Sequence, residues 1–565
     1  MKIKNQSKRS IVVALCLCLI MVSIFGFNMR VNAVSIYGVQ KPDWTPGISG
    51  GIPYVTQVCS VKDFGAVGNG TTNDLTAFQN AINSVSGSGA VYVPAGTYLL
   101  KGTLNMKSGV VLRGAGANST HLKFDSSAQM IRMTSSTSGS YVSLTGGYTK
   151  GSKSITVSNG SSFQVGNIIE IQQDNDTNAM YTRSDWNVSW AASAVGQITK
   201  VTAISGNTLT LEEPLRHAYK STLNPRARTI TPITNSGLEY MHIHRIDTSD
   251  THGIDIGGAY KCWIRACEVN TVKKSAVLLS RSYRVEIRDS YFHDATQFDG
   301  GGHGYGIELT YRASSTLIEN NIFKNFRHSY VIHLGATGNV FGYNYSREQT
   351  DNYPDVSFHG HWAYENLTEG NVVQRIGVGD WWGPNPYNTF LRNRVAVNVF
   401  VEDYSNYTYA IGNEIPNGGV YIDYQNVNSG GISRSTCIFH GNYESGTTKW
   451  ESGISDHTIP SSYYLSSKPG FFGSKQWPVT GSDVMGQGTI PAQDRWNSGN
   501  PNVLPGSGTP TPTPTPTVTP TPTPASTNLA LNKTVTYSSQ QSGNEAYKAV
   551  DGDTTTRWSA DTFPE

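Results

Sequence analysis

Apolar and polar positions alternate in short stretches that recur about every 20 to 30 residues between Val285 and Glu444. Several of these stretches end in Asn. They are VEIRDSYF (285–292), LIENNIF (317–323), VFGYNYS (340–346), LTEGNVV (367–373), FLRNRV (390–395), AIGNEI (410–415) and IFHGNYE (438–444). A period of this length is typical of a solenoid, in which each repeat buries its apolar face only against its neighbours. We therefore predict an all-β fold, a single-stranded right-handed parallel β-helix.

The polar residues that close these stretches predict a ladder along the solenoid. At spacings of about 20 to 31 residues they are Asp289, Asn320, Asn344, Asn371, Asn393, Asn413 and Asn442. Asn suits such a position because it tolerates left-handed backbone and because its amide can bond the equivalent Asn one coil along.

A second set of strands places polar side chains between inward apolar ones. GIDIGG (253–258), GIELTY (306–311), VIHLGA (331–336) and SFHGH (357–361) all alternate in this way, and AVLLS (276–280) lies between the first two. The alternation predicts one outward column made of Asp255, Leu278, Glu308, His333 and His359.

This column predicts a catalytic site. Parallel strands lie about 4.8 Å apart, so Asp255 and Glu308 are expected on the order of 10 Å apart at the backbone. Side chains can narrow that distance to the roughly 6.5–9.5 Å that inverting glycosidases leave for a water molecule. We assign Glu308 as general acid, kept protonated by Leu278, and Asp255 as base. His333 and His359 would tune the acid or hold the sugar.

Loops beside these strands carry further polar and aromatic residues. Sugar rings stack their apolar faces on aromatic side chains, so these loops predict substrate contacts, although any single Arg or Asp here can also serve only to bridge loops. The candidate substrate-binding residues are Asp250, His252, His303, Arg312, Arg327, His328, His361, Trp362, Glu365, Asp380 and Trp381.

The N-terminal part carries the first family resemblance. VKDFGAVGNGTTNDLTAFQNAIN (61–83) and SGSGAVYVPAGTYLL (86–100) resemble the opening of the pectate-lyase-like superfamily, which implies a β-helix that hosts hydrolases, lyases, epimerases and non-enzymes. Asn73 or Asp74 is expected to cap a helix that presents Leu75, Phe78 and Ile82 to the open end of the solenoid. From about residue 140 to 219 the period is interrupted, which predicts a small β insertion beside the helix.

The two ends of the chain predict export and a modular architecture. A basic start, an apolar run and VNA indicate a signal peptide over 1–33, with the β-helix domain over 34–507. Residues 508–527 are a Pro/Thr-rich linker. Residues 528–565, with AVDGDTTTRWSA (549–560), resemble the opening of a discoidin, or coagulation-factor type C, carbohydrate-binding module, which implies the start of a truncated β-sandwich.

Composition narrows the classes of partner. With 15% charged residues and a net charge of +2, the chain lacks the basic balance expected of a nucleic-acid-binding protein. We expect a secreted extracellular monomer that binds a polysaccharide and has no membrane contact after signal cleavage. Cys59, Cys262, Cys267 and Cys437 match no metal motif, and either buried thiols or a disulfide would fit them. A hydrolase would need no cofactor or metal, whereas for a lyase Ca²⁺ is an expected cofactor.

Known motifs of this superfamily are only partly present. GHG (302–304) resembles the polygalacturonase motif, but the accompanying DD and Arg-x-Lys are missing, and the pectate-lyase calcium cluster is not found. RHSYVIHLGATGNVFGYNYS (327–346) resembles a group of secreted bacterial β-helix proteins. Three functions therefore remain open: a glycoside hydrolase, a polysaccharide lyase or uronate epimerase with a His or Arg base, and a non-catalytic glycan-binding surface protein.

Overall fold

The computed structural model describes residues 35–350, 353–379, 381–422 and 434–504, together with 532–537, 539–553, 555 and 557–559 near the C-terminus. The predicted signal peptide (1–33) and the Pro/Thr-rich linker (508–527) lie outside these residues and stay predictions. The chain divides into two units, Met1–Ser507 and Gly508–Glu565.

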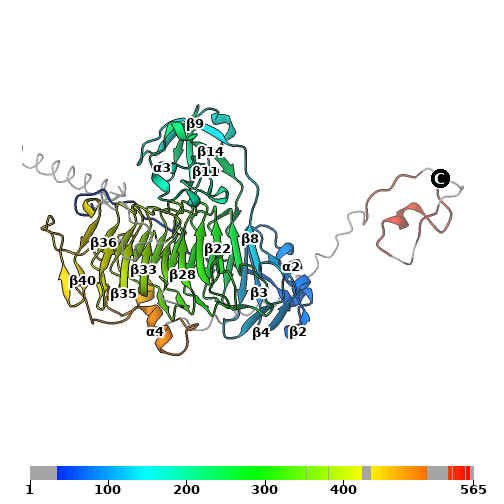
Figure 1. The fold of residues 1–565 in the computed structure, drawn as a ribbon. Coiled ribbons are helices and arrows are strands. Elements are labelled where there is room, and N and C mark those ends of the chain that lie inside the picture. Colours follow the sequence, from blue (N-terminus) through cyan, green and yellow to red (C-terminus); the bar gives the residue numbers. More distant parts are fainter. Residues whose placement is uncertain are drawn as a thin grey trace, which may run out of the picture. The chain divides into compact units, whose positions relative to one another are not determined.

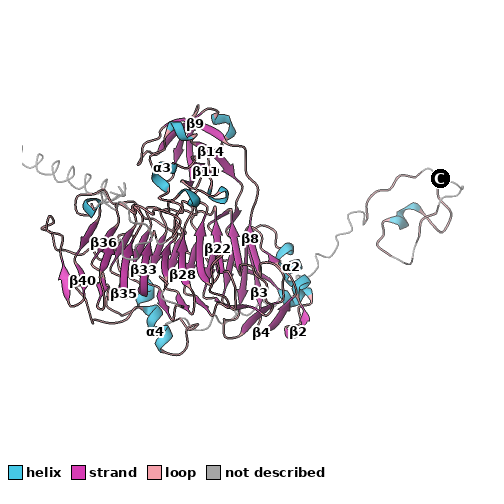
Figure 2. Cartoon of the chain, in the orientation of Figure 1, coloured by secondary structure: helices cyan, strands magenta, loops and turns pink. Residues whose placement is uncertain are grey.

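The first unit is a parallel β-helix with three faces, as the alternating pattern predicted (Figures 1 and 2). Sheet I contains β1 (Gln57–Ser60), β3 (Gly89–Val93), β6 (Val110–Gly114), β16 (Gly237–Glu239), β20 (Trp263–Arg265), β23 (Glu286–Arg288), β26 (Leu317–Glu319), β29 (Val340–Gly342), β32 (Leu367–Glu369), β34 (Thr389–Leu391), β36 (Tyr409–Ile411) and β39 (Ile438–His440).

Two further runs of parallel strands complete the coils. The two runs are joined by the long strands β33 and β35, which belong to both. Sheet II contains β2 (Asn69–Asn73), β4 (Gly96–Leu100), β7 (Thr120–Phe124), β17 (His242–Arg245), β21 (Glu268–Asn270), β24 (Tyr291–His293), β27 (Ile322–Lys324), β30 (Tyr345–Arg347), β33 (Val372–Val378), β35 (Arg394–Val401), β37 (Glu414–Ile415) and β40 (Asn442–Glu444). Sheet III contains β5 (Leu104–Asn105), β8 (Ile131–Thr134), β18 (Ile254–Gly257), β22 (Ser275–Ser280), β25 (Tyr305–Thr310), β28 (His328–Ile332), β31 (Val356–Phe358), β33, β35 and β38 (Val420–Ile422).

A helix covers the N-terminal end of the apolar interior, as expected for a repeat protein. Helix α2 (Leu75–Ser84) buries Phe78 and Ile82 in the same core cluster as the inward residues of the coils. The Asn73 side chain accepts a hydrogen bond from the Leu75 N–H. Asp74 holds the N-cap position, but its carboxylate accepts from the backbone N–H groups of Val67 and Gly68 instead.

Two Asn ladders lie at the turns between the sheets, and one of them corrects the predicted register. From Asn344 to Asn442 the predicted members stack, each side-chain oxygen accepting from the backbone and side-chain amides of the preceding Asn. Upstream the ladder continues through Asn321 and Ser290, not through Asn320 and Asp289.

The correction has a conformational cause. Asp289 and Asn320 take positive φ of 60° and 56°, and so do the residues that precede the other ladder members, such as Tyr343 and Gly370. The left-handed residue is therefore the one before the ladder, and the ladder Asn itself supplies the amide. A second ladder, through Asn339, Asn366 and Asn388, follows sheet III and was not predicted.

The interruption of the period folds as a closed antiparallel barrel beside sheet III, visible above the solenoid in Figure 1. Its strands are β9 (Val142–Gly146), β10 (Ser154–Val157), β11 (Ile168–Gln172), β12 (Gly196–Ser205), β13 (Thr208–Leu211) and β14 (Arg226–Ile230). The barrel has its own apolar core, which includes Ile169, Val201 and Leu209. Its last strand ends at Ile230, beyond the expected boundary near residue 219.

The cysteines and helices of the described residues bear on the remaining predictions. Cys59, Cys262, Cys267 and Cys437 are free thiols, and the last three are buried. Within the described ranges, no helix has the length and apolarity needed to cross a membrane. In the second unit, the short helix η8 (Ala546–Ala549) is formed, and the resemblance to a discoidin module stays a prediction.

Candidate functional site

The outward face of sheet III carries the two predicted carboxylates at the predicted register. Asp255 on β18 pairs with Leu278 on β22, and Leu278 pairs with Glu308 on β25. Their apolar neighbours, such as Ile307 and Leu309, are fully buried in the core. Asp255 and Glu308 therefore project from one face, two strand spacings apart.

The histidines do not continue this column, which corrects the prediction. The partners that follow Glu308 are Val331 on β28 and Ser357 on β31. His333 and His359 lie two residues further along their chains. Because side chains alternate with a period of two, both remain on the outward face, in the neighbouring row.

Glu308 is held by a cluster of polar side chains. Its Oε1 lies 2.9 Å from Nε2 of His333, and its Oε2 accepts from the Ser275 hydroxyl. The Nδ1 atom of His252 lies 3.9 Å from Oε2 and accepts a hydrogen bond from the Ser275 N–H. Glu308 as a whole residue is 9% exposed, so its carboxylate is almost buried.

The pKa values of the two carboxyls shift in directions opposite to those assumed from the sequence. Burial raises the pKa of Glu308, but the hydrogen bond from His333, the charges of His333 and His252 and the Ser275 hydroxyl together bring it down to about 2. Burial raises the pKa of Asp255, against the charges of His252 and Arg132. Glu308 is therefore the more readily ionised of the two and Asp255 the one that holds its proton to higher pH, opposite to the expectation that Leu278 keeps Glu308 protonated.

Several of the predicted loop residues lie around this cluster or on the same side of the solenoid. His303 joins two loops, with Nε2 2.9 Å from Asp250 and Nδ1 2.8 Å from the Gly300 carbonyl. Arg327 donates to the Asp299 carbonyl and lies over the Tyr353 ring at 4.5 Å. The buried ring of His328 has Nδ1 2.5 Å from the Pro354 carbonyl.

Other predicted substrate-binding residues attach the barrel to the solenoid instead. Arg312 is 2% exposed and forms an ion pair with Glu170 of β11 at 2.6 Å. Glu365 is buried and pairs with Lys150 and Arg216. These two side chains therefore bind protein, which makes their assignment to substrate wrong.

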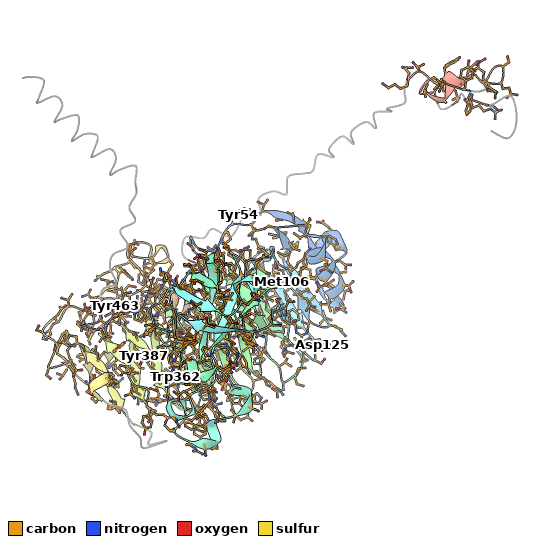
Figure 3. All side chains as sticks on the ribbon, turned by 90° about the horizontal axis from the view of Figure 1, so that it is seen from above. Tyr54, Met106, Asp125, Trp362, Tyr387 and Tyr463 are labelled. Carbon is orange, nitrogen blue, oxygen red and sulfur yellow. The ribbon has the colours of Figure 1, made fainter. Side chains whose placement is uncertain are left out.

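Of the predicted ring-bearing residues near the barrel, two are packed against other residues and one is exposed at the surface. His361 is fully buried beside the Trp186 carbonyl, and Trp362 (labelled in Figure 3) packs with Leu334 and barrel residues. Trp381 is 40% exposed and stays available for a sugar ring. Asp380 lies outside the described residues.

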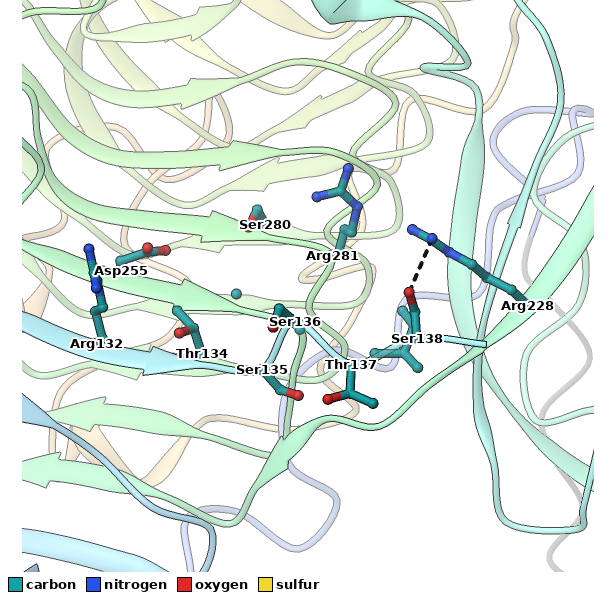
Figure 4. A pocket seen from close by; sticks show the side chains of 13 residues that line it. Arg132, Thr134, Ser135, Ser136, Thr137, Ser138, Arg228, Asp255, Ser280 and Arg281 are labelled. Carbon is teal, nitrogen blue, oxygen red and sulfur yellow. Dashed lines mark hydrogen bonds between the residues drawn. The ribbon is translucent and has the colours of Figure 1, made fainter. Parts of the chain in front are cut away.

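A cleft of about 500 Å³ adjoins Asp255 where the barrel meets sheet III (Figure 4). Its lining includes Arg132, Thr134, Arg228, Ser280 and Arg281, none of which was predicted. One signal was present in the sequence, because Ile131, Arg132, Met133 and Thr134 alternate as the column strands do. Ser275, which opens β22 and donates its hydroxyl to Glu308, was also missed, because it has the same parity along the strand as the inward residues Val277 and Leu279.

In the described part of the chain, no group of three or more His, Cys, Asp or Glu side chains is arranged to hold a metal ion.

Two family models match the chain. One is described as rhamnogalacturonase A/epimerase, pectate lyase-like, over residues 58–300, and the other as a right handed beta helix region, over 233–372. These matches agree with the superfamily resemblance found in the opening residues and with the handedness predicted for the solenoid.

Curated relatives match only short stretches. Mannuronan C5-epimerase AlgE3 of Azotobacter vinelandii is 41% identical over 93 residues, 15% of this chain and 5% of the relative. The pre-neck appendage protein of Bacillus phage phi29 is 43% identical over 65 residues, 12% of this chain and 7% of the relative. The chain thus spans only a small fraction of the length of these relatives.

Solved structures resemble the chain at low identity. The tailspike protein gp49 of Pseudomonas phage LKA1 has a TM-score of 0.49 at 16% identity, covering 64% of each chain. The catalytic unit of a GH87 alpha-1,3-glucanase from Streptomyces thermodiastaticus has a TM-score of 0.33 at 13% identity, covering 74% of this chain and 72% of the other.

Proposed function

We propose that this chain is a secreted polysaccharide hydrolase in which Glu308 and Asp255 act as base and acid on the outer face of the β-helix. One observation carries the proposal. Two outward carboxyls lie two strands apart, and their surroundings shift their pKa values in opposite directions. Such a pair is a common arrangement for dividing acid and base roles between two carboxyl groups.

The expected reaction inverts the configuration of the sugar. Two strand spacings put the backbones about 10 Å apart, which leaves room for a water molecule between the carboxyls. Glu308 takes a proton from this water as its oxygen bonds the anomeric carbon. Asp255 gives a proton to the glycosidic oxygen as the bond from that oxygen to the anomeric carbon breaks. His333 and Ser275 fix the orientation of Glu308 and hold it ionised.

A lyase or uronate epimerase is the second candidate. It is favoured by the contact between His333 Nε2 and Glu308 Oε1, because a carboxylate can orient an imidazole that removes the proton alpha to a sugar carboxylate. The short matches to mannuronan C5-epimerases add support from the relatives. Ca²⁺ would be expected only with lyase chemistry.

A panel of neutral and acidic polysaccharides separates these candidates. Hydrolysis releases reducing ends without an unsaturated product, and NMR of early products shows inversion at the anomeric carbon. A lyase releases reducing ends together with ultraviolet-absorbing unsaturated ends, whereas an epimerase changes the uronate composition without cleavage. Binding without any of these changes would contradict the enzyme proposal and favour a glycan-binding surface protein.

A further inference from the structure

The cleft beside Asp255 contains an excess of positive charge. Arg132 comes from β8 of the solenoid, Arg281 follows β22, and Arg228 comes from β14 of the barrel (Figure 4). Asp255 is the only carboxylate among the cleft-lining residues in the described part of the chain. Burial raises the pKa of this Asp, which weakens it as a counter-charge.

Behind the cleft wall, one buried carboxylate forms ion pairs with three arginines. Glu170 is fully buried, and its oxygens lie 2.6 Å from Arg312, 2.6 Å from Arg228 and 3.5 Å from Arg281. Three guanidinium groups and one carboxylate leave a surplus of two positive charges. Surplus positive charge at a partly desolvated site favours an anionic partner.

Arg281 and Arg132 have capacity left for a ligand. The Nε of Arg281 is buried and faces Glu170 at 3.5 Å, while the side chain as a whole is 40% exposed and so presents the rest of its guanidinium to solvent. Arg132 is exposed and donates to the Gln129 side chain at 2.7 Å. No carboxylate of the described chain lies within ion-pair distance of Arg132.

The floor of the cleft is formed by a glycine, which has no side chain to fill the space above it. Gly257 lies two residues after Asp255 on the same outward face. A Cβ at this position would lie 3.1 Å from the Ser280 hydroxyl and 3.4 Å from a Thr134 methyl. The missing side chain thus leaves space between Thr134 and Ser280, both of which line the cleft.

We propose that this cleft is a subsite for an anionic sugar, one that carries a carboxylate or a sulfate, next to the carboxyl pair. Arg132 and Arg281 bind the anionic group, and Arg228 supplies positive charge from the barrel wall. Guanidinium groups suit this role because their N–H groups match the two oxygens of a carboxylate or sulfate. The inference rests on the proposed function, since it names the substrate class of the same site.

Binding is measured on the full chain carrying Glu308→Gln, so that turnover does not consume the ligand. Titration calorimetry compares oligogalacturonate, a sulfated galactan oligosaccharide and a neutral xylan oligosaccharide. We expect at least one anionic ligand to bind more tightly than the neutral one, with an affinity that falls as salt is added. Arg132→Gln and Arg281→Gln should each weaken that binding about ten- to a hundredfold.

Matched variants separate ligand contact from folding. Arg434→Gln removes an exposed guanidinium that pairs with Glu451, and it should leave the affinity unchanged. Gly257→Ala should weaken binding by filling the floor without changing charge. Thermal unfolding of every variant reports whether it still folds, and Arg132, which bonds only a Gln side chain, is the substitution least expected to disturb folding.

Each outcome of these titrations either supports or overturns the anionic subsite. Preference for the carboxylated or for the sulfated ligand supports the subsite and identifies the anion. Equal binding of the neutral ligand with no effect of the Arg variants, or no binding of any anionic ligand, overturns it. Anionic binding together with a lack of turnover by the unsubstituted chain on every glycan would leave the subsite standing and remove the hydrolase proposal.

Discussion

Glu308 shows how a nearly buried carboxyl can remain ionised. Removal from water favours its neutral form, yet the contacts from His333 and Ser275 favour the charged one and prevail. Asp255 lacks such a set of donors, so burial dominates and raises its pKa. The difference between these two carboxyls comes from neighbouring side chains, and the proposed division of acid and base roles rests on it.

Removing either carboxyl should stop turnover while leaving the protein folded. Glu308→Gln deletes the base and Asp255→Asn deletes the acid, and each is expected to lower kcat by roughly 10²–10⁴-fold. Initial rates on the best glycan of the panel, with circular dichroism as the check on folding, measure this. Glu451→Gln, a partly exposed carboxyl paired with Arg434, is the control. Near-normal rates in Glu308→Gln would disprove its role as base.

His333 should set the acidic limit of activity. Burial raises the pKa of Glu308, and His333, with His252 and Ser275, brings it down to about 2. Loss of the imidazole removes the first of these lowering contributions, so in His333→Ala the base becomes protonated at higher pH. The acidic limb of kcat/KM is then expected to move upward, whereas the parent keeps its base ionised down to about pH 2. His457→Ala, an exposed ring stacked on Trp450, should not move the limb. An unshifted profile in His333→Ala would contradict the assignment.

At the scale of the elements, the Asn ladders join successive coils where regular strand pairing stops. Asn371 is fully buried; it accepts from both amides of Asn344 and donates to Asn393 and to the Phe341 carbonyl. One side chain thus satisfies polar groups from three coils. Buried backbone groups need such partners, because leaving them without a hydrogen bond is costly.

Asn371→Ala should destabilise the solenoid strongly. The substitution leaves buried amides of Asn344 and the Phe341 carbonyl without partners, so the free energy of unfolding should fall by about 2–4 kcal/mol. Denaturant unfolding followed by Trp fluorescence measures the change. Asn417→Ala, whose amide bonds the Ala396 carbonyl at an exposed turn, should cost much less. Equal effects of both substitutions would show that the ladder adds nothing beyond an ordinary surface bond.

A buried acid of sheet I, Glu369 of β32, predicts a pH effect on stability. Glu369 is fully buried beneath Tyr463, whose N–H it accepts at 2.8 Å, and burial raises its pKa to about 7. A raised pKa contributes stability at low pH that is lost as pH rises from about 4.5 through 7, on the order of 3 kcal/mol. Denaturant unfolding at several pH values should show this fall. Glu369→Gln should flatten it, and an unchanged slope would contradict the prediction.

The alternation of apolar and polar residues predicted which face of a strand each side chain occupies. It was less reliable for the register, that is, for which residues of successive coils lie opposite one another. The two-residue period of Asp255 and Glu308 fixed their outward direction, and their coils also paired at the expected register. A shift by two residues preserves the face, so the same pattern misplaced His333 and His359 along theirs. Arg312 was misassigned because its partner Glu170 lies 142 residues earlier, in the inserted barrel. No local pattern reveals such a pairing.

At the scale of the whole first unit, buried ion pairs fasten the inserted barrel to the solenoid and form one wall of the cleft. Arg312 of the solenoid binds Glu170 of the barrel, Arg284 of the solenoid binds Glu213 of the insertion, and Arg216 of the insertion pairs with Glu365 of the solenoid. These charged contacts are supplemented by apolar packing of Leu334 against barrel residues. The geometry of the cleft therefore depends on electrostatics between two independently cored bodies.

Glu170→Gln should weaken this junction and the cleft together. It leaves Arg312, Arg228 and Arg281 without their shared counter-charge, and breaking a buried charge network of this kind costs about 3–5 kcal/mol. Hydrogen exchange should show faster opening of β11 and β14 than of the distant strands β29 and β32. Arg183→Gln, which removes an exposed pair with Asp185, is the control. If β11 exchanges as slowly in Glu170→Gln as in the parent, the barrel is held by its apolar contacts, and the arginines belong to the cleft alone.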